Sequence, residues 1–156
     1  MRALAYTNNI IQLCEVHETE NSIYLITEQI ANQNLEMVLK CPSTDSEIKS
    51  FSSKMDIQKI IFTLLETLSD FAAQGILHRN IKSRNILIDF ASNIKISNFG
   101  LATFANSPKI NFRNCGTPGY IAPEVLNFNE ETPESVYDAR CDVFSAGCIF
   151  FELYVL

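Results

Sequence analysis

The chain contains the segment His78-Arg79-Asn80-Ile81-Lys82-Ser83-Arg84-Asn85-Ile86-Leu87, which directly follows a long stretch of periodic apolar residues. In that stretch the apolar residues recur at the i, i+3, i+4 and i+7 positions typical of an amphipathic helix, and they are Ile57, Ile60, Ile61, Leu64, Leu65, Leu68, Phe71 and Ala72. Asp56 is a suitable N-terminal cap and Gly75 a suitable C-terminal stop. The sequence therefore predicts a helix over residues 57–72 that ends just before the His78 segment.

Shorter patterns on both sides of this helix predict strands and loops. The strands are expected at residues 10–16, 22–28, 86–88 and 94–96, the first two joined by a polar turn at 17–21. A short helix is expected at 35–39, a surface loop at 41–53 and an irregular, partly mobile segment at 98–124. Residues 143–156 are apolar all round, which is typical of a buried helix.

Composition excludes several classes of protein. The chain has 156 residues, enough for one domain, and its net charge of −6 argues against binding to nucleic acid or to a membrane surface. Its five cysteines include no Cys-x-x-Cys pair and are expected to be reduced, mostly buried thiols. No apolar run approaches the ~20 residues of a membrane helix, and the N-terminus does not resemble a signal peptide. We therefore expect a cytoplasmic protein, with the nucleus as the alternative.

Four segments together resemble the eukaryotic Ser/Thr protein kinase family, and they occur in the family's order: 78–87, 98–102, 115–124 and 142–147. The resemblance implies an α+β, protein-kinase-like fold, mainly the helical C-terminal lobe with remnant strands of the N-terminal lobe. It implies one partial kinase-like domain over 1–156, in which 1–30 are the end of the N-lobe and the hinge and 31–156 are a truncated C-lobe. No glycine-rich loop precedes residue 10 and the ATP-anchoring lysine is absent, so we expect either a fragment or truncated gene product, or a reduced kinase relic. A truncated large lobe would leave apolar surface exposed.

The resemblance places two asparagines where the family has catalytic aspartates. Asn80 occupies the position of the aspartate that accepts the proton of the substrate hydroxyl, and a carboxamide cannot hold that proton. Asn98, thirteen residues after Asn85, occupies the position of the aspartate that holds Mg²⁺. Asn85 matches the family's second metal ligand and is also neutral, so both asparagines are metal ligands by position only.

The other family positions are kept. Lys82 matches the lysine that contacts the transferred phosphate, and Thr117 lies in a substrate-binding segment of Ser/Thr kinase type. The adenine site implied by the resemblance consists of the gatekeeper, the hinge and the residue beneath the adenine ring, which are Thr27, Glu28 to Ile30, and Leu87. His78 and Phe99 match an apolar stack between the lobes, and Asp142 matches the anchor of the catalytic-loop backbone.

These residues predict a catalytically impaired pseudokinase that acts as a binding or scaffolding module for protein partners. The alternatives are an active Ser/Thr kinase with ATP-dependent phosphotransfer, and a non-functional truncated fragment. ATP is implied by the resemblance alone, with weak or absent binding expected, and the neutral ligands argue against Mg²⁺. Arg113 stands where many Ser/Thr kinases carry a phosphorylated threonine, so we expect no activation by phosphorylation there.

Overall fold

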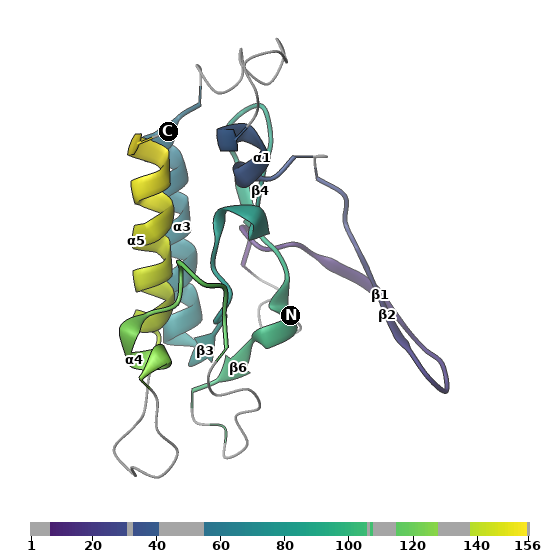
Figure 1. Cartoon of the computed structure of the whole chain (residues 1–156). Coiled ribbons are helices and arrows are strands. Elements are labelled where there is room, and N and C mark those ends of the chain that lie inside the picture. The colour runs from purple at the N-terminus through teal and green to yellow at the C-terminus, as the bar shows by residue number, and fades with distance from the viewer. Residues whose placement is uncertain are drawn as a thin grey trace.

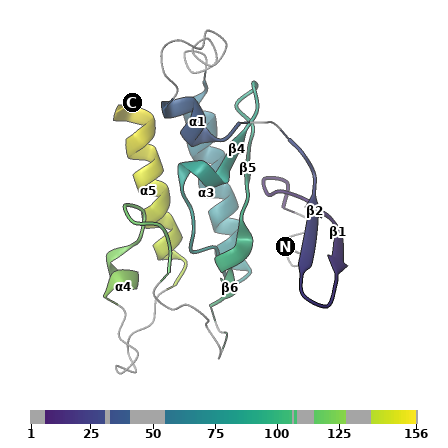
Figure 2. The same cartoon turned by 45° about the vertical axis from the view of Figure 1, so that its right-hand side comes forward.

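A computed structural model describes residues 7–30, 33–40, 55–105, 107, 115–127 and 138–155. Helices α3 (Ile57–Ala73) and α5 (Arg140–Val155) lie side by side and form the body of the molecule (Figures 1 and 2). The hairpin of strands β1 (Leu13–Glu18) and β2 (Ile23–Thr27) projects away from this body. Between the two lie short elements that carry the His78 segment.

Helix α3 confirms the helix that the periodicity predicts. The Asp56 side chain accepts a hydrogen bond of 2.9 Å from the backbone N–H of Lys59, so it caps the helix N-terminus. After the helix ends, Gly75 adopts φ 65°, a left-handed conformation that glycine reaches without strain. The buried face of the helix carries Ile60, Leu64, Thr67, Leu68 and Phe71. Burying each large apolar side chain contributes about 1.5–3 kcal/mol, so this face anchors the core.

Helix α5 differs from the expectation of a helix buried all round. Cys141, Ala146, Ile149 and Leu153 are buried, whereas Phe151 and Tyr154 are 68% and 70% exposed. Within the part of the chain that the structure describes, α3 covers one side of α5, so the opposite side meets solvent. The expectation that apolar surface would be exposed is confirmed for this helix.

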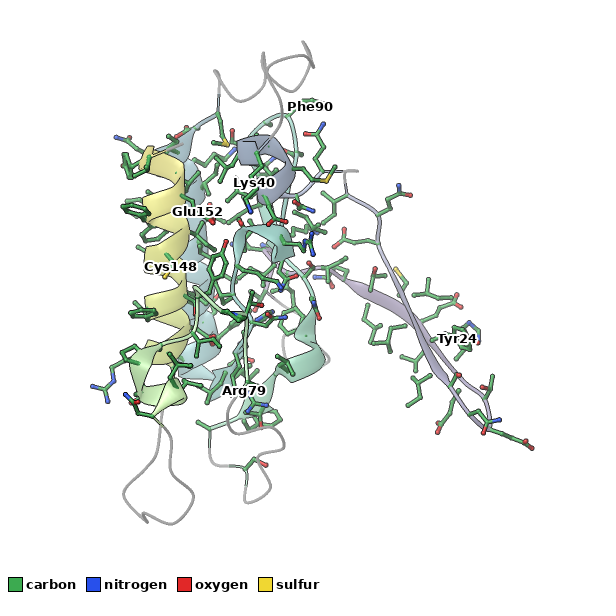
Figure 3. The ribbon with its side chains drawn as sticks, in the orientation of Figure 1. Tyr24, Lys40, Arg79, Phe90, Cys148 and Glu152 are labelled. Carbon is green, nitrogen blue, oxygen red and sulfur yellow. The ribbon has the colours of Figure 1, made fainter. Side chains whose placement is uncertain are left out.

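The strands follow the predicted pairs with small shifts. In the hairpin β1–β2 the backbone N–H of Thr19 donates to the carbonyl oxygen of Ser22 at the turn. The predicted first strand begins at Leu13 rather than residue 10, because Ile10 instead forms a parallel bridge with Ile96 and is buried in the core. Tyr24 of this hairpin points into solvent (Figure 3).

Two further short strands form the platform behind the His78 segment. Strands β4 (Ile86–Ile88) and β5 (Ile94–Ile96) are antiparallel, with the pairs Ile86–Ile96, Leu87–Lys95 and Ile88–Ile94. Their four isoleucines are buried and the middle pair is half-buried, as the period-2 alternation of a strand requires. Helix α1 (Leu35–Lys40) packs against this platform and buries Leu35 and Val38.

The described parts of the predicted irregular segment hold the short elements η3 (Phe99–Leu101) and β6 (Thr103–Phe104), and α4 (Pro123–Leu126) begins at its end. Strand β6 pairs with β3 (Ile76–Leu77), and a 3₁₀ turn, η2 (Ser83–Asn85), precedes β4. The predicted loop at 41–53 lies outside the described residues, as does Arg113. None of the helices that the structure describes has both the length and the apolar character needed to cross a bilayer.

The exposure of the described cysteines differs from the expectation that most of them are buried. Cys141 is buried, Cys115 and Cys148 are half-buried, and Cys14 on the projecting hairpin is exposed. Exposure of Cys14 follows from the projection of its strand away from the core, which flanking apolar residues do not reveal. Cys41 lies outside the described residues.

Candidate functional site

The backbone of the His78 segment is held by one buried carboxylate. The two oxygens of Asp142, at the start of α5, accept the backbone N–H groups of His78 and Arg79 at 2.7 and 2.8 Å. Asp142 is 2% exposed, and burial raises the pKa of its carboxyl to about 6. Arg79 has φ 63°, which is uncommon for a residue other than glycine. The paired hydrogen bonds to Asp142 stabilise this strained turn, because both N–H groups would otherwise be buried without an acceptor.

The ring of His78 joins three segments. Its Nε2 lies 3.1 Å from the backbone oxygen of Ser97, which can only accept, so Nε2 carries the proton. Its Nδ1 then accepts the backbone N–H of Asn80 at 3.3 Å. Complete burial lowers the pKa of His78 to about 4, which keeps the ring neutral.

The ring of His78 packs against the rings of two phenylalanines, which also pack against each other. The ring centroid of His78 lies 4.8 Å from that of Phe99 and 6.3 Å from that of Phe71, and the two phenylalanine rings are 5.8 Å apart. The resemblance made His78 and Phe99 two members of an apolar stack but did not assign Phe71 to it. The periodicity of the helix at 57–72 predicts that Phe71 is buried in the core. It does not predict which rings Phe71 contacts, because these lie on other segments of the chain.

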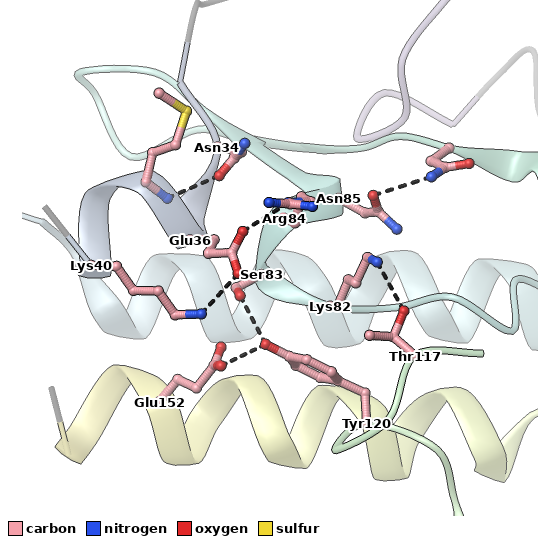
Figure 4. A network of polar contacts seen from close by, with 12 residues as sticks. Asn34, Glu36, Lys40, Lys82, Ser83, Arg84, Asn85, Thr117, Tyr120 and Glu152 are labelled. Atoms are coloured by element: carbon pink, nitrogen blue, oxygen red, sulfur yellow. Dashed lines mark hydrogen bonds and ion pairs between the residues drawn. The ribbon is translucent and has the colours of Figure 1, made fainter.

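Three predicted site residues meet through one hydroxyl. Lys82 Nζ donates to Thr117 Oγ1 at 2.8 Å, and Thr117 Oγ1 donates to Asn80 Oδ1 at 3.1 Å. Figure 4 shows Lys82, just before η2, and Thr117, in the segment before α4, approaching each other. All three side chains are half-buried. The structure therefore brings together Asn80, Lys82 and Thr117, although Thr117 lies 37 residues from Asn80.

Asn85 and Asn98 form the second half of the site. Asn85 Nδ2 donates to the backbone oxygen of Asn80 at 2.7 Å, and Asn98 Nδ2 lies 3.4 Å from Asn85 Oδ1. Asn98 has φ 65°, a left-handed conformation that asparagine tolerates better than most residues. The two amides thus face each other as donor and acceptor.

This donor set does not fit a divalent cation. Mg²⁺ requires hard oxygen ligands, most often with at least one carboxylate. Here the oxygen of Asn85 faces an N–H group of Asn98 rather than a second oxygen. Among the described residues no group of three or more His, Cys, Asp or Glu side chains is placed to hold a metal ion. The site as built offers two neutral amides and no anionic ligand.

The predicted adenine-site residues lie at the end of β2 and on β4. Thr27 pairs with Leu13 in the hairpin, and the carboxylate of Glu28 accepts the N–H of Gln12 at 2.8 Å. Glu28 also forms an ion pair of 2.5 Å with Lys95, which lowers the pKa of Glu28.

That ion pair connects the predicted hinge to the platform of β4 and β5. Lys95 is the β5 partner of Leu87, so Glu28 is tied to the strand that pairs with β4, which carries Leu87. Ile30 is half-buried beyond β2. No hydrogen bond or ion pair between described residues links Thr27, Glu28 or Ile30 directly to Asn80, so these residues form a separate part of the site.

Sequence reasoning missed a polar network beside the site. Tyr120 Oη donates to Glu152 Oε1 at 2.5 Å and lies 3.0 Å from Ser83 Oγ (Figure 4). Glu152 Oε2 is buried with no hydrogen-bond partner among the described residues. Burial and the neighbouring Glu152 raise the pKa of Tyr120 to about 12. The available signal was Glu152, a charged residue within the apolar run 143–156. A carboxylate in a buried helix needs a hydrogen-bond partner, so a polar contact could have been expected there.

Comparison with known proteins agrees with the geometry. The protein kinase domain family matches residues 1–155. The chain is 33% identical over 149 residues to a probable serine/threonine-protein kinase of Dictyostelium discoideum, covering 94% of this chain and 12% of that protein. It is 32% identical over 146 residues to serine/threonine-protein kinase cds1 of Schizosaccharomyces pombe, covering 92% of this chain and 30% of that protein.

A plant relative and a solved structure show the same similarity. CBL-interacting protein kinase 2 of Oryza sativa subsp. japonica is 34% identical over 150 residues, which cover 93% of this chain and 30% of that protein. The chain thus spans less than a third of the length of these three relatives. A chain of the yeast RNA Pol II CTD kinase CTDK-1 complex superimposes with a TM-score of 0.73 at 27% identity, covering 98% of this chain and 47% of that one. With the Asp142-anchored loop, the ring stack and a family match over residues 1–155, the chain belongs to the protein kinase family.

Proposed function

We propose that this chain is a serine/threonine protein-kinase-like domain with impaired catalysis, a pseudokinase that acts as a binding or scaffolding module. Residues 1–30 would be the end of the N-lobe and the hinge, and 31–156 would belong to the C-lobe. The observation that carries the proposal is the side chain of Asn80. It sits in the position of the catalytic base, and its oxygen is occupied by the hydroxyl of Thr117 at 3.1 Å.

The chemistry of Asn80 limits the rate of any phosphotransfer. A general base must accept the proton of the substrate hydroxyl, and positioned base catalysis is worth roughly 10²–10⁴-fold. An amide oxygen can accept a hydrogen bond but does not hold a proton near neutral pH. Kinases of this family generally use ATP and Mg²⁺, and the two amides of Asn85 and Asn98 supply no carboxylate for the metal. Weak or absent ATP binding is part of the proposal.

Two features support the role of a binding module. The loop scaffold is intact, because Asp142 anchors the backbone and the ring of His78 meets that of Phe99 edge to face. Helix α5 exposes large apolar side chains, including Phe151 and Tyr154, and exposed apolar surface is typical of protein interaction sites. Protein partners are therefore the proposed ligands. The four described cysteines are free thiols, which supports a cytoplasmic or nuclear location.

The proposal is tested by phosphotransfer from labelled ATP to a generic Ser/Thr protein substrate, with an intact Ser/Thr kinase assayed alongside. We expect turnover at least ~100-fold below that of the intact enzyme, because base assistance is lost. The matched variants are Lys82→Ala in the site and Lys59→Ala, whose ammonium instead binds the backbone oxygen of Ala91. Mg²⁺-dependent turnover that disappears in Lys82→Ala and persists in Lys59→Ala would show an active kinase and refute the proposal.

A further inference from the structure

One side of helix α5 carries a continuous row of exposed residues without a polar side chain beyond the hydroxyl of a tyrosine. We call this row the apolar stripe, and its members are Val143, Phe144, Gly147, Phe151, Tyr154 and Val155. At 3.6 residues per turn they cover about a third of the helix circumference. The four central members follow one another at intervals of three, four and three residues. This is the spacing of the contact positions in a pair of packed helices.

No charged side chain interrupts the apolar stripe. Two of the three charged residues of α5 point into the molecule: Asp142 accepts the backbone N–H groups of the His78 segment, and Glu152 accepts the hydroxyl of Tyr120 (Figure 4). The third, Arg140, lies at the start of the helix and pairs with Asp138. A partner that binds by charge would find no opposite charge on the stripe, so the partner surface must itself be apolar.

The apolar stripe is complementary to itself when its direction is reversed. Phe144 and Tyr154 lie five residues from Ile149 on either side, and Gly147 and Phe151 lie two residues from it. Two copies of α5 packed antiparallel about a two-fold axis at that level therefore bring the members of each pair into contact, twice per dimer. A Cβ at Gly147 would meet nothing within 4 Å, so the ring of Phe151 from the other copy has space there.

Other arrangements fit this pattern less well. Parallel packing would place Gly147 against Gly147 of the other copy and leave a gap, with the two Phe151 rings crowded against each other. A helix of a different protein would need a large residue opposite Gly147 and a small one opposite Phe151. A second copy of this chain supplies both at the required positions.

From this self-complementary spacing we infer that the apolar stripe of α5 is the interface of a homodimer, in which a second copy of this chain packs its own α5 antiparallel. The inference rests on the proposed function, because it names the protein partner of the binding module. The aromatic side chains of the stripe would bury on the order of 700 Å² in the dimer. That area is below the range of stable complexes, so a weak, reversible dimer with a micromolar dissociation constant is expected.

Sedimentation equilibrium of the whole chain over a wide range of concentration tests the inference. The average mass should rise from that of one chain to that of two and should not rise further, because a two-fold interface is closed. Added salt should leave the dimer intact or strengthen it. The stripe contains no ion pair to be screened, whereas the two chains, each with a net charge of −6, repel each other.

Variants locate the interface. Phe151→Ser removes two rings from each dimer and should raise the dissociation constant at least ~30-fold. Gly147→Gln fills the space opposite Phe151 and should raise it at least ~5-fold. Phe62→Ser is the matched control, since Phe62 is an exposed phenylalanine of α3 outside the stripe, and it should change the dissociation constant less than ~2-fold. All three positions are exposed, and circular dichroism checks that the variants remain folded.

Disulfide cross-linking reports the direction of packing. Chains with Phe144→Cys and chains with Tyr154→Cys are oxidised with diamide, separately and as a mixture, with the wild type alongside to measure linking through the native cysteines. Antiparallel packing places residue 144 of one copy against residue 154 of the other. The mixture should therefore link the two variants to each other, while each variant alone should link no more than the wild type does.

Four results would overturn the inference. They are the mass of a single chain at every concentration, association that continues past two chains, a dimer that Phe151→Ser and Gly147→Gln leave unchanged, and variants that link to themselves rather than to each other. The same preparation is assayed for phosphotransfer. If the chain stays single and turnover is absent, the inference fails and the proposed function stands. Mg²⁺-dependent turnover refutes the proposed function, and the sedimentation result then decides the dimer separately.

Discussion

The substitution Asp142→Asn tests how one buried carboxylate holds the functional loop. Both oxygens of Asp142 accept backbone N–H groups, from His78 at 2.7 Å and from Arg79 at 2.8 Å. Asparagine has one oxygen, so one N–H would face an NH₂ group and lose its acceptor. A hydrogen bond to a charged group contributes about 1.5–3 kcal/mol, and a buried N–H without a partner costs about 1–3 kcal/mol.

Removal of a buried charge offsets part of that loss. Burial raises the pKa of Asp142 to about 6, so its carboxylate is ionised at pH 7.5 but is held there against a desolvation penalty. We therefore expect a net loss of about 2 kcal/mol in the free energy of unfolding at pH 7.5. For a chain of this size that corresponds to a fall in Tm of about 4–8 °C.

Urea unfolding measures the loss, and amide hydrogen exchange locates it. Protection of the His78 or Arg79 amide should fall, while the amides of α3 remain protected. Asp138→Asn is the matched control: Asp138 is half-exposed and pairs with Arg140 on the surface, where ion pairs contribute about 0–1 kcal/mol. An Asp142→Asn variant with the wild-type urea midpoint and unchanged exchange would refute the assignment of Asp142 as the anchor of the loop.

Three further predictions concern stability. Gly116→Ala should destabilise the fold by about 1–3 kcal/mol in urea unfolding, because φ is 133° and a Cβ would lie 2.9 Å from a side-chain atom of Ile121. His78→Phe should remove a pH dependence: burial lowers the folded pKa of His78 from 6.5 to about 4, so the unfolded state binds the proton first. As pH falls from about 6.5 to about 4 the wild type should lose about 3 kcal/mol relative to this variant. Tyr120→Phe should cost about 1.5–3 kcal/mol at pH 7, measured by urea unfolding, because the Glu152 carboxylate loses its donor at 2.5 Å.

Each of these predictions has a control or a contradicting outcome. Gly147→Ala is the matched control for Gly116→Ala. A Cβ at Gly147 meets nothing within 4 Å, and alanine in a helix is more stable than glycine by about 1 kcal/mol, so this variant should not be destabilised. For His78→Phe, the titration of Asp142 changes stability in the opposite direction to that of His78. Asp142 is present in both the wild type and the variant, so its contribution cancels in the difference between them. Parallel pH profiles would contradict a buried neutral His78. For the third, Tyr24→Phe on the exposed hairpin should leave stability unchanged, and an equal loss in both tyrosine variants would contradict the Glu152 contact.

The elements that could be predicted from the sequence have strong local signals. Helix α3 carries its own apolar face, cap and stop, and the strand pairs β1–β2 and β4–β5 are joined by short polar turns. The exposed side of α5 could not be predicted, because its composition is apolar on every side and only neighbouring elements decide which side is covered. The buried contact of Tyr120 with Glu152 was missed for the same reason, since it joins residues 32 positions apart.

The sequence by itself determined the family of this protein and the absence of two carboxylates, because the identity of a side chain is a covalent property. Asn80 and Asn98 lack an acidic group in any fold. Only the tertiary structure decided what these amides do. Thr117, 37 residues away, orients the oxygen of Asn80, and Asp142, 64 residues from His78, holds the loop. Such contacts arise from the packing of distant segments, so the order of donors and acceptors in the site follows from the fold and not from the motif.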